Sequence, residues 1–138
     1  MANIITLFIT DDDEDDRDFI ITALSKESFD CKFIVCENGA DLINKLRAVA
    51  HLRAHIVLLD LNMPVMNGYE TLKVIKNDSA LGCIPVIILT SSSKPDDEQY
   101  CYDLGCNVFL RKPLSLDGYD TLAVNIISFA KANANSCA

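Results

Sequence analysis

The sequence predicts an α/β fold, a doubly wound five-stranded parallel sheet made of five β–α units with helices on both faces. Short apolar runs alternate with segments whose apolar residues recur at helical spacing. The run from Ile56 to Leu59 is continuously apolar, as in a strand that is buried on both faces. Buried strands that are joined by helices make right-handed crossovers and form parallel sheets.

The first half of the chain contains three predicted strands and two predicted helices. The strands are Ile4–Ile9, Lys32–Cys36 and Ile56–Leu59. The first helix, Glu14–Lys26, has its apolar residues at Phe19, Ile20, Ala23 and Leu24. Asn38-Gly39 interrupts the chain before the second helix. The apolar face of that helix consists of Leu42, Ile43, Leu46, Val49 and Ala50.

The second half supplies three more helices and two more strands. Gly68–Asn77 is predicted as a helix with Leu72 and Ile75 facing inward, and the strands are Pro85–Leu89 and Val108–Leu110. Between these strands lies a weaker, polar helix, Pro95–Leu104. Its expected core contacts are Tyr100, Cys101 and Leu104. The last helix has the clearest apolar stripe, formed by Tyr119, Leu122, Ala123, Ile126, Ile127 and Ala130.

Length and composition restrict the class of protein. A chain of 138 residues, half of them hydrophobic, is expected to form one domain with a substantial core. The net charge of −8 argues against nucleic acid as a direct partner. Met1–Phe8 lacks the basic start of a signal peptide, and no apolar stretch approaches the roughly 20 residues of a membrane span, so we expect a cytoplasmic protein. The cysteines are expected to be reduced core residues; they are Cys31, Cys36, Cys83, Cys101, Cys106 and Cys137.

Polar residues that can carry chemistry follow four of the five strands. Asp11 and Asp12 follow the first strand, Asp60 the third, Thr90 the fourth and Lys112 the fifth. Ligands of such sheets bind at the carboxyl ends of the strands. Adjacent carboxylates repel one another, and Mg²⁺ removes that cost. The set suits phosphoryl transfer, with Asp60 as a nucleophile that forms an aspartyl phosphate.

Each of these signals also has a simpler interpretation. A lone aspartate after a strand is often a helix cap, and Lys112 is compatible with a surface position. We interpret Glu14, Asp15 and Asp16 as a solvated acidic helix start. His51 and His55 flank a helix–strand junction and are expected to be solvated. The prediction of a phosphoryl-transfer site therefore depends on the joint placement of these residues after four different strands.

Four motifs resemble those of the bacterial response-regulator receiver family. They are Ile9-Thr10-Asp11-Asp12-Asp13, the segment from Leu58 to Gly68 that reads LLDLNMPVMNG, Ile88-Leu89-Thr90, and Lys112-Pro113. The pattern D-x-x-M-P-x-M-x-G in the second motif is highly specific, and the motifs occur in the family's order. The resemblance extends from Ile4 to about Lys131 and implies a flavodoxin-like strand order of 2-1-3-4-5.

The resemblance implies a role for individual residues. Asp60 matches the phosphorylated aspartate, and Asp11 and Asp12 match the acidic pair that supports Mg²⁺, with Mn²⁺ as a substitute. The other matches are Asn62 as a metal ligand through its backbone carbonyl, Thr90 as the switch hydroxyl, Phe109 as the switch aromatic, Lys112 as the partner of the phosphoryl group, and Asn62 and Ser92 as positions that tune aspartyl-phosphate lifetime. The Lys112–Pro113 bond is cis in the family. Phe109, Arg111 and Leu114 differ from the commonest residues at their positions.

The implied function is signal transfer in a two-component system or phosphorelay. A sensor histidine kinase, hybrid kinase or phosphotransfer protein would phosphorylate Asp60, and output would pass by protein contact or further phosphotransfer. The chain is therefore expected to be a phosphoacceptor that assists its own phosphorylation and autodephosphorylation, and not a turnover enzyme. Residues 1–138 are expected to form a single receiver domain without an output domain, as a monomer or a phosphorylation-promoted homodimer. The loop Asn77–Ile84 resembles that of stand-alone regulators that pair with phytochrome-type kinases.

Three other functions would each account for part of the sequence. A calcium-binding loop that starts at Asp11 fails because Asp16 stands at its sixth position and Thr22 at its twelfth, where Gly and Glu are needed. Asp11-x-Asp13 has the spacing of a small aspartate-nucleophile phosphatase, but that reading leaves the motif around Asp60 unexplained. A phosphorylation-independent interaction module remains an alternative, although the complete site argues against it.

Overall fold

The computed structural model describes residues 4–49, 54–133 and 135. In these described residues, five strands alternate with five helices, as predicted. In chain order they are β1 (Ile5–Thr10), α1 (Glu14–Ser25), β2 (Cys31–Cys36), α2 (Gly39–Val49), β3 (His55–Leu59), α3 (Gly68–Asn77), β4 (Val86–Thr90), α4 (Pro95–Leu104), β5 (Val108–Arg111) and α5 (Leu116–Asn133). β1 and β4 each begin and end one residue later than predicted, so each includes the threonine that was expected to follow it; Thr10 pairs with Cys36, and Thr90 pairs with Arg111.

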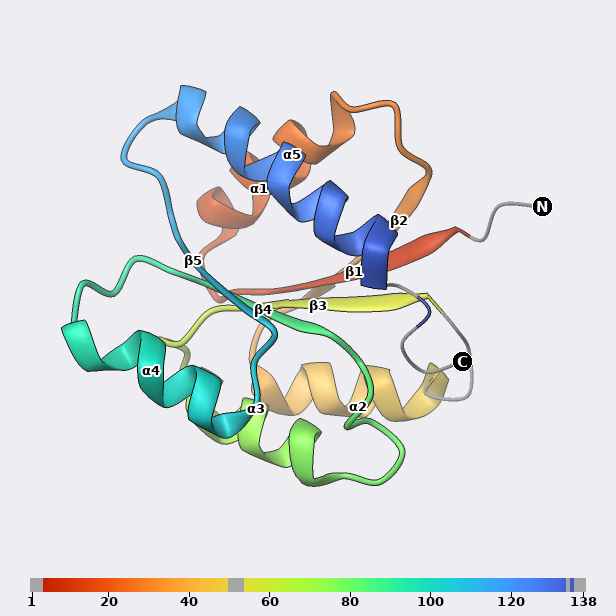
Figure 1. Cartoon of the computed structure of the whole chain (residues 1–138), viewed down its shortest axis with the longest axis vertical. Coiled ribbons are helices and arrows are strands. Elements are labelled where there is room, and N and C mark those ends of the chain that lie inside the picture. The colour runs from red at the N-terminus through yellow and green to blue at the C-terminus, as the bar shows by residue number, and fades with distance from the viewer. Residues whose placement is uncertain (1–3, 50–53, 134, 136–138) are drawn as a thin grey trace.

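The strands form one parallel sheet in the order β2-β1-β3-β4-β5, which confirms the predicted topology. Helices α1 and α5 lie on one face of the sheet, and α2, α3 and α4 lie on the other (Figure 1). In a doubly wound sheet the strand order reverses between β1 and β3, so the connections that follow these two strands run to opposite faces of the sheet and leave a crevice at the strands' carboxyl ends.

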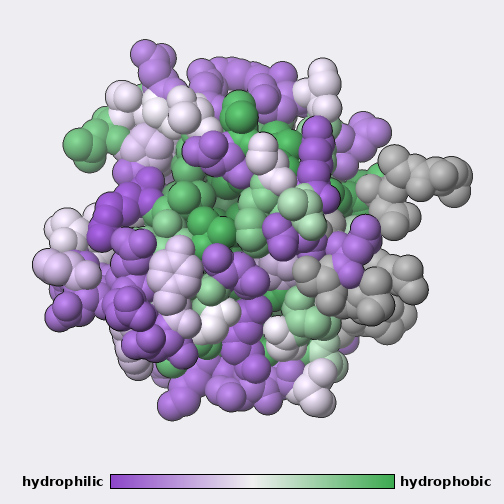
Figure 2. All heavy atoms as spheres, viewed as in Figure 1, coloured by the Kyte–Doolittle hydropathy of each residue, from purple (hydrophilic) through white to green (hydrophobic). Residues whose placement is uncertain are grey.

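The core consists of two hydrophobic layers, one on each face of the sheet. Every residue of β3 and β4 is buried, as expected for central parallel strands. The predicted stripe of α5 is buried in full against α1, from Tyr119 to Ala130. Hydrophilic residues cover most of the face seen in Figure 2, and hydrophobic atoms show through its middle, along the β5 edge of the sheet. No helix in the described part of the chain is long and apolar enough to cross a membrane.

Two helices place their apolar residues differently from the prediction. On α1, Ile20, Ala23 and Leu24 are buried, but Phe19 is exposed and packs against Tyr119 at the helix surface. On α4, Cys101 is buried as predicted, whereas Tyr100 is 50% exposed. Its ring packs on Tyr69 of α3, 5.2 Å between centroids, so the neighbouring helix holds it at the surface.

Two further expectations are wrong. His55 was expected to be solvated, but it is buried, because it is the first residue of the central strand β3 and its ring lies edge-on to Phe8. His51 lies outside the described residues. Within residues 54–133 no peptide bond is cis, so the Lys112–Pro113 bond is trans, the isomer that X–Pro bonds intrinsically prefer.

The cysteine prediction is confirmed for four residues. Cys36, Cys101 and Cys106 are buried free thiols, and Cys31 is a half-buried free thiol. Burial raises the pKa of Cys36 to about 11 and that of Cys106 to about 11, which keeps both protonated and unreactive at neutral pH. For Cys83 the expectation of a reduced thiol is wrong, because this residue is disulfide-bonded. Cys137 lies outside the described residues.

Candidate functional site

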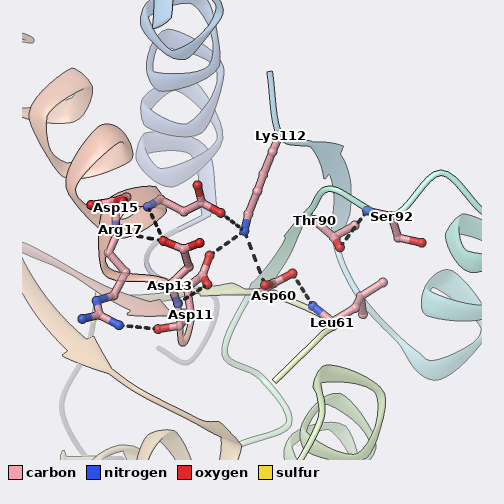
Figure 3. Close-up of polar contacts among 10 residues, drawn as sticks. Asp11, Asp13, Asp15, Arg17, Asp60, Leu61, Thr90, Ser92 and Lys112 are labelled. Carbon is pink, nitrogen blue, oxygen red and sulfur yellow. Dashed lines mark hydrogen bonds and ion pairs between the residues drawn. The ribbon is translucent and has the colours of Figure 1, made fainter. Parts of the chain in front are cut away.

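The carboxyl ends of β1, β3, β4 and β5 bring the predicted polar residues to one edge of the sheet (Figure 3). The Asp60 N–H donates to the Thr10 carbonyl over 3.0 Å, so the ends of β1 and β3 are tied together. One carboxylate oxygen from each of Asp11, Asp12 and Asp60 lies within 4.8 Å of the others. Asp11 and Asp60 are buried, whereas Asp12 is exposed at the mouth of the crevice.

The connection between β1 and α1 is held by its own acidic residues. Asp11 Oδ1 accepts a hydrogen bond from the Asp13 N–H over 2.9 Å. Asp13 is the N-cap of α1, and its carboxylate accepts from the N–H groups of Asp15 and Asp16. Arg17 of the first turn donates to the Asp11 carbonyl over 2.7 Å. These bonds fix the direction of Asp11, and they place the first turn of α1 directly above the crevice.

Lys112 is the centre of the charge arrangement. Its ammonium lies 2.7 Å from Asp11, 2.7 Å from Asp16 and 3.4 Å from Asp60, and its side chain is 7% exposed. Burial opposes the charge on Lys112, but the hydrogen bonds to Asp11 and Asp16 and the charge of Asp60 outweigh it. The pKa of Lys112 therefore lies above its ordinary value, and the side chain is a permanent cation beside Asp60.

Asp16 was missed as a site residue, because the acidic start of α1 was interpreted as solvated. Glu14 and Asp15 are exposed, in line with that interpretation. Asp16 instead forms the ion pair with Lys112 across the crevice. A sequence signal exists, because Asp16 lies in the first turn of the helix, three residues after the N-cap Asp13, and helical side chains point back toward the helix N-terminus, which here adjoins the end of β1.

The clustered carboxylates of Asp11, Asp12 and Asp60 need a cation to balance their charge. Burial raises the pKa of Asp11 to about 6, although the hydrogen bond from Lys112 acts in the opposite direction. The Lys112 ammonium pairs with Asp11, Asp16 and Asp60, and Asp12 adds a further carboxylate beside Asp11 and Asp60. Oxygen donors from two or three carboxylates, one of them open to water, are the ligands that a hard divalent ion such as Mg²⁺ or Mn²⁺ takes. The residues present therefore fit a divalent metal.

The loop after β3 fixes Asp60 by close packing of the backbone. Asp60 Oδ1 accepts a hydrogen bond from the Leu61 N–H over 2.8 Å, which leaves Oδ2 toward Lys112. The Gly68 N–H donates to the Leu61 carbonyl over 3.0 Å. A Cβ at Gly68 would lie 2.2 Å from the carbonyl oxygen of Asp60, so only glycine fits there. Asn67 starts α3 with a capping box that includes Glu70.

The same loop contains a strained residue. Val65 has a φ of 67°, the left-handed region that a β-branched residue rarely adopts, and it is 85% exposed. Asn62 is exposed at the start of the loop, two residues beyond Asp60. Its predicted roles as a carbonyl ligand and as a lifetime-tuning side chain stay predictions.

The predicted switch residues lie on the β4–β5 side of Asp60. Thr90 is fully buried at the end of β4, and its Oγ1 accepts a hydrogen bond from the Ser92 N–H over 3.2 Å (Figure 3). Phe109 is buried in the layer that also contains Cys101, so its ring already points inward. Arg111 is exposed, with its guanidinium 5.2 Å from the centre of the Phe109 ring, and Leu114 is fully exposed.

Comparison with known proteins agrees with this arrangement. Residues 7–122 match the model of the response regulator receiver domain. The chain is 29% identical to response regulator Rre1 of Synechocystis over 99% of its own length, but it spans only 57% of that relative. Two solved structures are similar over most of both chains. The phosphorylated cyanobacterial phytochrome response regulator RcpA has a TM-score of 0.86, is 28% identical and is matched over 96% of this chain and 98% of its own.

The second structure is the Mn²⁺-bound form of response regulator Rcp1, a protein of Synechocystis. It has a TM-score of 0.81, is 29% identical and is matched over 91% of this chain and 93% of its own. The family match covers the whole sheet except its first residues, and it includes Asp11, Asp60, Thr90 and Lys112. This chain belongs to the receiver domain family of two-component response regulators.

Proposed function

We propose that this chain takes a phosphoryl group onto Asp60 in a Mg²⁺-dependent reaction, from a sensor histidine kinase, a hybrid kinase or a phosphotransfer protein. The observation that carries the proposal is the surrounding of Asp60. A buried carboxylate stands within 4.8 Å of two others and 3.4 Å from a buried lysine ammonium. Such a cluster of buried charges is unfavourable by itself. It is well suited to a bound metal ion together with the oxygens of an incoming phosphoryl group.

The reaction is an in-line displacement at phosphorus. A carboxylate oxygen of Asp60 bonds to phosphorus while the bond from phosphorus to the donor's histidine nitrogen breaks, and the electron pair leaves with the nitrogen. The Leu61 N–H holds Asp60 Oδ1 and so fixes the plane of the nucleophile. Lys112 pairs with a phosphoryl oxygen as charge moves onto Asp60, and the Thr90 hydroxyl donates to another.

A divalent ion held by Asp11, Asp12 and Asp60 would neutralise the phosphoryl oxygens and the carboxylate that attacks them. The Mn²⁺-bound form of the similar protein Rcp1 supports a divalent ion in this chain, and Mg²⁺ is the ion that we propose here. The backbone carbonyl of Asn62 would complete the protein ligands.

Signalling would follow from a population shift around Thr90. The hydroxyl turns toward the phosphoryl group, and the β4–α4 loop and the surface of α4, β5 and α5 change with it. Phe109 is the switch aromatic in this proposal, and its ring already points inward. Output would pass by protein contact or by onward phosphotransfer, from a monomer or from a homodimer promoted by phosphorylation. A phytochrome-type kinase is one candidate donor, since the similar structure of RcpA belongs to a phytochrome response regulator.

Acetyl phosphate labelling tests this proposal. The protein is incubated with Mg²⁺ and acetyl phosphate and resolved on a phosphate-affinity gel. Wild type should shift, and Asp60→Asn should not. Asp18→Asn, which removes an exposed carboxylate of α1, is the matched control and should shift like wild type. Chelation of the metal should abolish the shift. A wild type that is labelled neither by acetyl phosphate nor by a kinase would refute the proposal and leave a phosphorylation-independent interaction module.

A further inference from the structure

Asp16 differs from the other carboxylates that pair with Lys112. Within the part of the chain that the structure describes, Lys112 pairs with Asp11, Asp16 and Asp60. Asp11 and Asp60 also belong, with Asp12, to the group of carboxylates that fits a divalent ion, and Asp16 does not. Asp16 contacts the ammonium from the first turn of α1. Its contact with Lys112 is therefore independent of the metal ligands.

The Lys112 ammonium already hydrogen-bonds as many carboxylates as it has N–H groups. An ammonium has three donors, and here they face Asp11 and Asp16 at 2.7 Å and Asp60 at 3.4 Å. In Figure 3 the Lys112 side chain ends between Asp11 and Asp60. The contact with Asp60, on which the phosphoryl group would form, is the longest of the three. A phosphoryl oxygen would thus have to take a donor from one of these carboxylates.

The position of Asp16 is set by the helix to which it belongs. Its N–H donates to the carboxylate of the N-cap Asp13 over 3.2 Å. α1 packs on α5 in the hydrophobic layer that contains Ile20, Ala23 and Leu24. Lys112, in contrast, holds its ammonium on a flexible four-carbon stem. The ammonium therefore follows the carboxylate of Asp16, and the side of the crevice formed by α1 decides where it rests.

We propose that Asp16 is a positioning residue that holds the Lys112 ammonium toward α1 and so limits how strongly Lys112 binds a phosphoryl group on Asp60. This inference rests on the proposed function, in which Lys112 pairs with a phosphoryl oxygen. Asp16 and the phosphoryl oxygens are anions that compete for the same donors. Hydrogen bonds between charged groups are the strong ones, so the competition is large enough to measure. Removal of the Asp16 carboxylate frees one donor and lets the ammonium move toward Asp60.

Beryllofluoride, an anion that takes the place of a phosphoryl group on a carboxylate, measures this competition without a covalent step. Its affinity in the presence of Mg²⁺ is measured by isothermal titration calorimetry. Asp16→Ala should bind beryllofluoride roughly three- to tenfold more tightly than wild type, the effect of one hydrogen bond. Asp15→Ala removes an exposed carboxylate from the same helix turn and should bind like wild type. An unchanged or weaker affinity in Asp16→Ala, or an equal gain in both variants, overturns the inference.

A second measurement uses the free protein and does not depend on phosphoryl chemistry. NMR couplings across hydrogen bonds join the Lys112 Nζ to the carboxyl carbons of its partners. In wild type the couplings to Asp11 and Asp16 should exceed the coupling to Asp60, in keeping with the distances. In Asp16→Ala the coupling to Asp60 should increase. An unchanged coupling overturns the inference even in a protein that binds no beryllofluoride. Failure of wild type to bind beryllofluoride and to be labelled by acetyl phosphate, in contrast, counts against the proposed function.

Discussion

The buried charge of Asp11 should make the metal-free protein less stable than a variant without it. Burial raises the pKa of Asp11 from 3.8 to about 6, which at ~1.36 kcal/mol per pH unit corresponds to ~3 kcal/mol. Because the folded carboxyl has the higher pKa, the folded state binds the proton more tightly than the unfolded state. Stability from this group is therefore fully present below pH 3.8 and is lost as the pH rises through about 6.

Asp11→Asn recovers part of this energy. In wild type the Asp13 N–H donates to Asp11 Oδ1, and the amide oxygen of the variant can accept the same hydrogen bond. The amide NH₂ would face the Lys112 ammonium, which keeps Asp16 and Asp60 as partners. Two donors face to face cost on the order of 1 kcal/mol, so we expect a net gain of ~1–2 kcal/mol in the free energy of unfolding at neutral pH.

Urea unfolding measures this gain. The chain has no tryptophan, so the transition is followed by far-UV circular dichroism, in EDTA, at neutral pH and near pH 4. At neutral pH the free energy of unfolding of Asp11→Asn should be larger than that of wild type. This difference should shrink on acidification. Mg²⁺ should also reduce the difference, because wild type binds the ion more tightly. Asp18→Asn is the surface-charge control. A variant no more stable than wild type in EDTA, or a gap that persists near pH 4, would refute the reasoning.

Three further substitutions test other parts of the site. Asp16→Asn removes a 2.7 Å partner of the buried Lys112 ammonium and should lower the free energy of unfolding by ~1–2 kcal/mol in the same titration; an unchanged midpoint would show that Asp16 does not stabilise Lys112. Gly68→Ala places a Cβ 2.2 Å from the Asp60 carbonyl and should cost ~3 kcal/mol or more, seen as a lowered or lost thermal transition. Val65→Gly relieves the left-handed backbone and should raise stability by about 1 kcal/mol; a lower Tm would argue against strain at Val65.

The elements were predictable because their signals are local. The stripe of α5 follows from helical periodicity alone, and its predicted residues from Tyr119 to Ala130 are all buried. The topology followed from the alternation of strands and helices together with the family motifs. The same local reasoning placed Asp11, Asp60, Thr90 and Lys112 at strand ends, and the structure brings these ends together at one edge of the sheet.

The errors occur where a neighbouring element decides the environment. His55 reads as a polar junction residue, but it starts a central strand and lies against Phe8. On α4 the aromatic Tyr100 was expected inside and is at the surface, while the acidic Asp97 is buried. Tyr69 of α3 explains both positions, because its ring packs on Tyr100 and its hydroxyl donates a hydrogen bond to Asp97. Periodicity within α4 contains no information about α3.

The sequence by itself determined the class of fold, the family and the residues available for chemistry, because periodicity and motifs are properties of neighbouring positions. Only the tertiary structure decided how those residues share charge. Lys112 meets Asp16, which is 96 positions away in the chain, as well as Asp11 and Asp60, and Asp97 receives Ser92 and Tyr69. Electrostatic energy depends on distance and burial, and both are set by how separate elements pack.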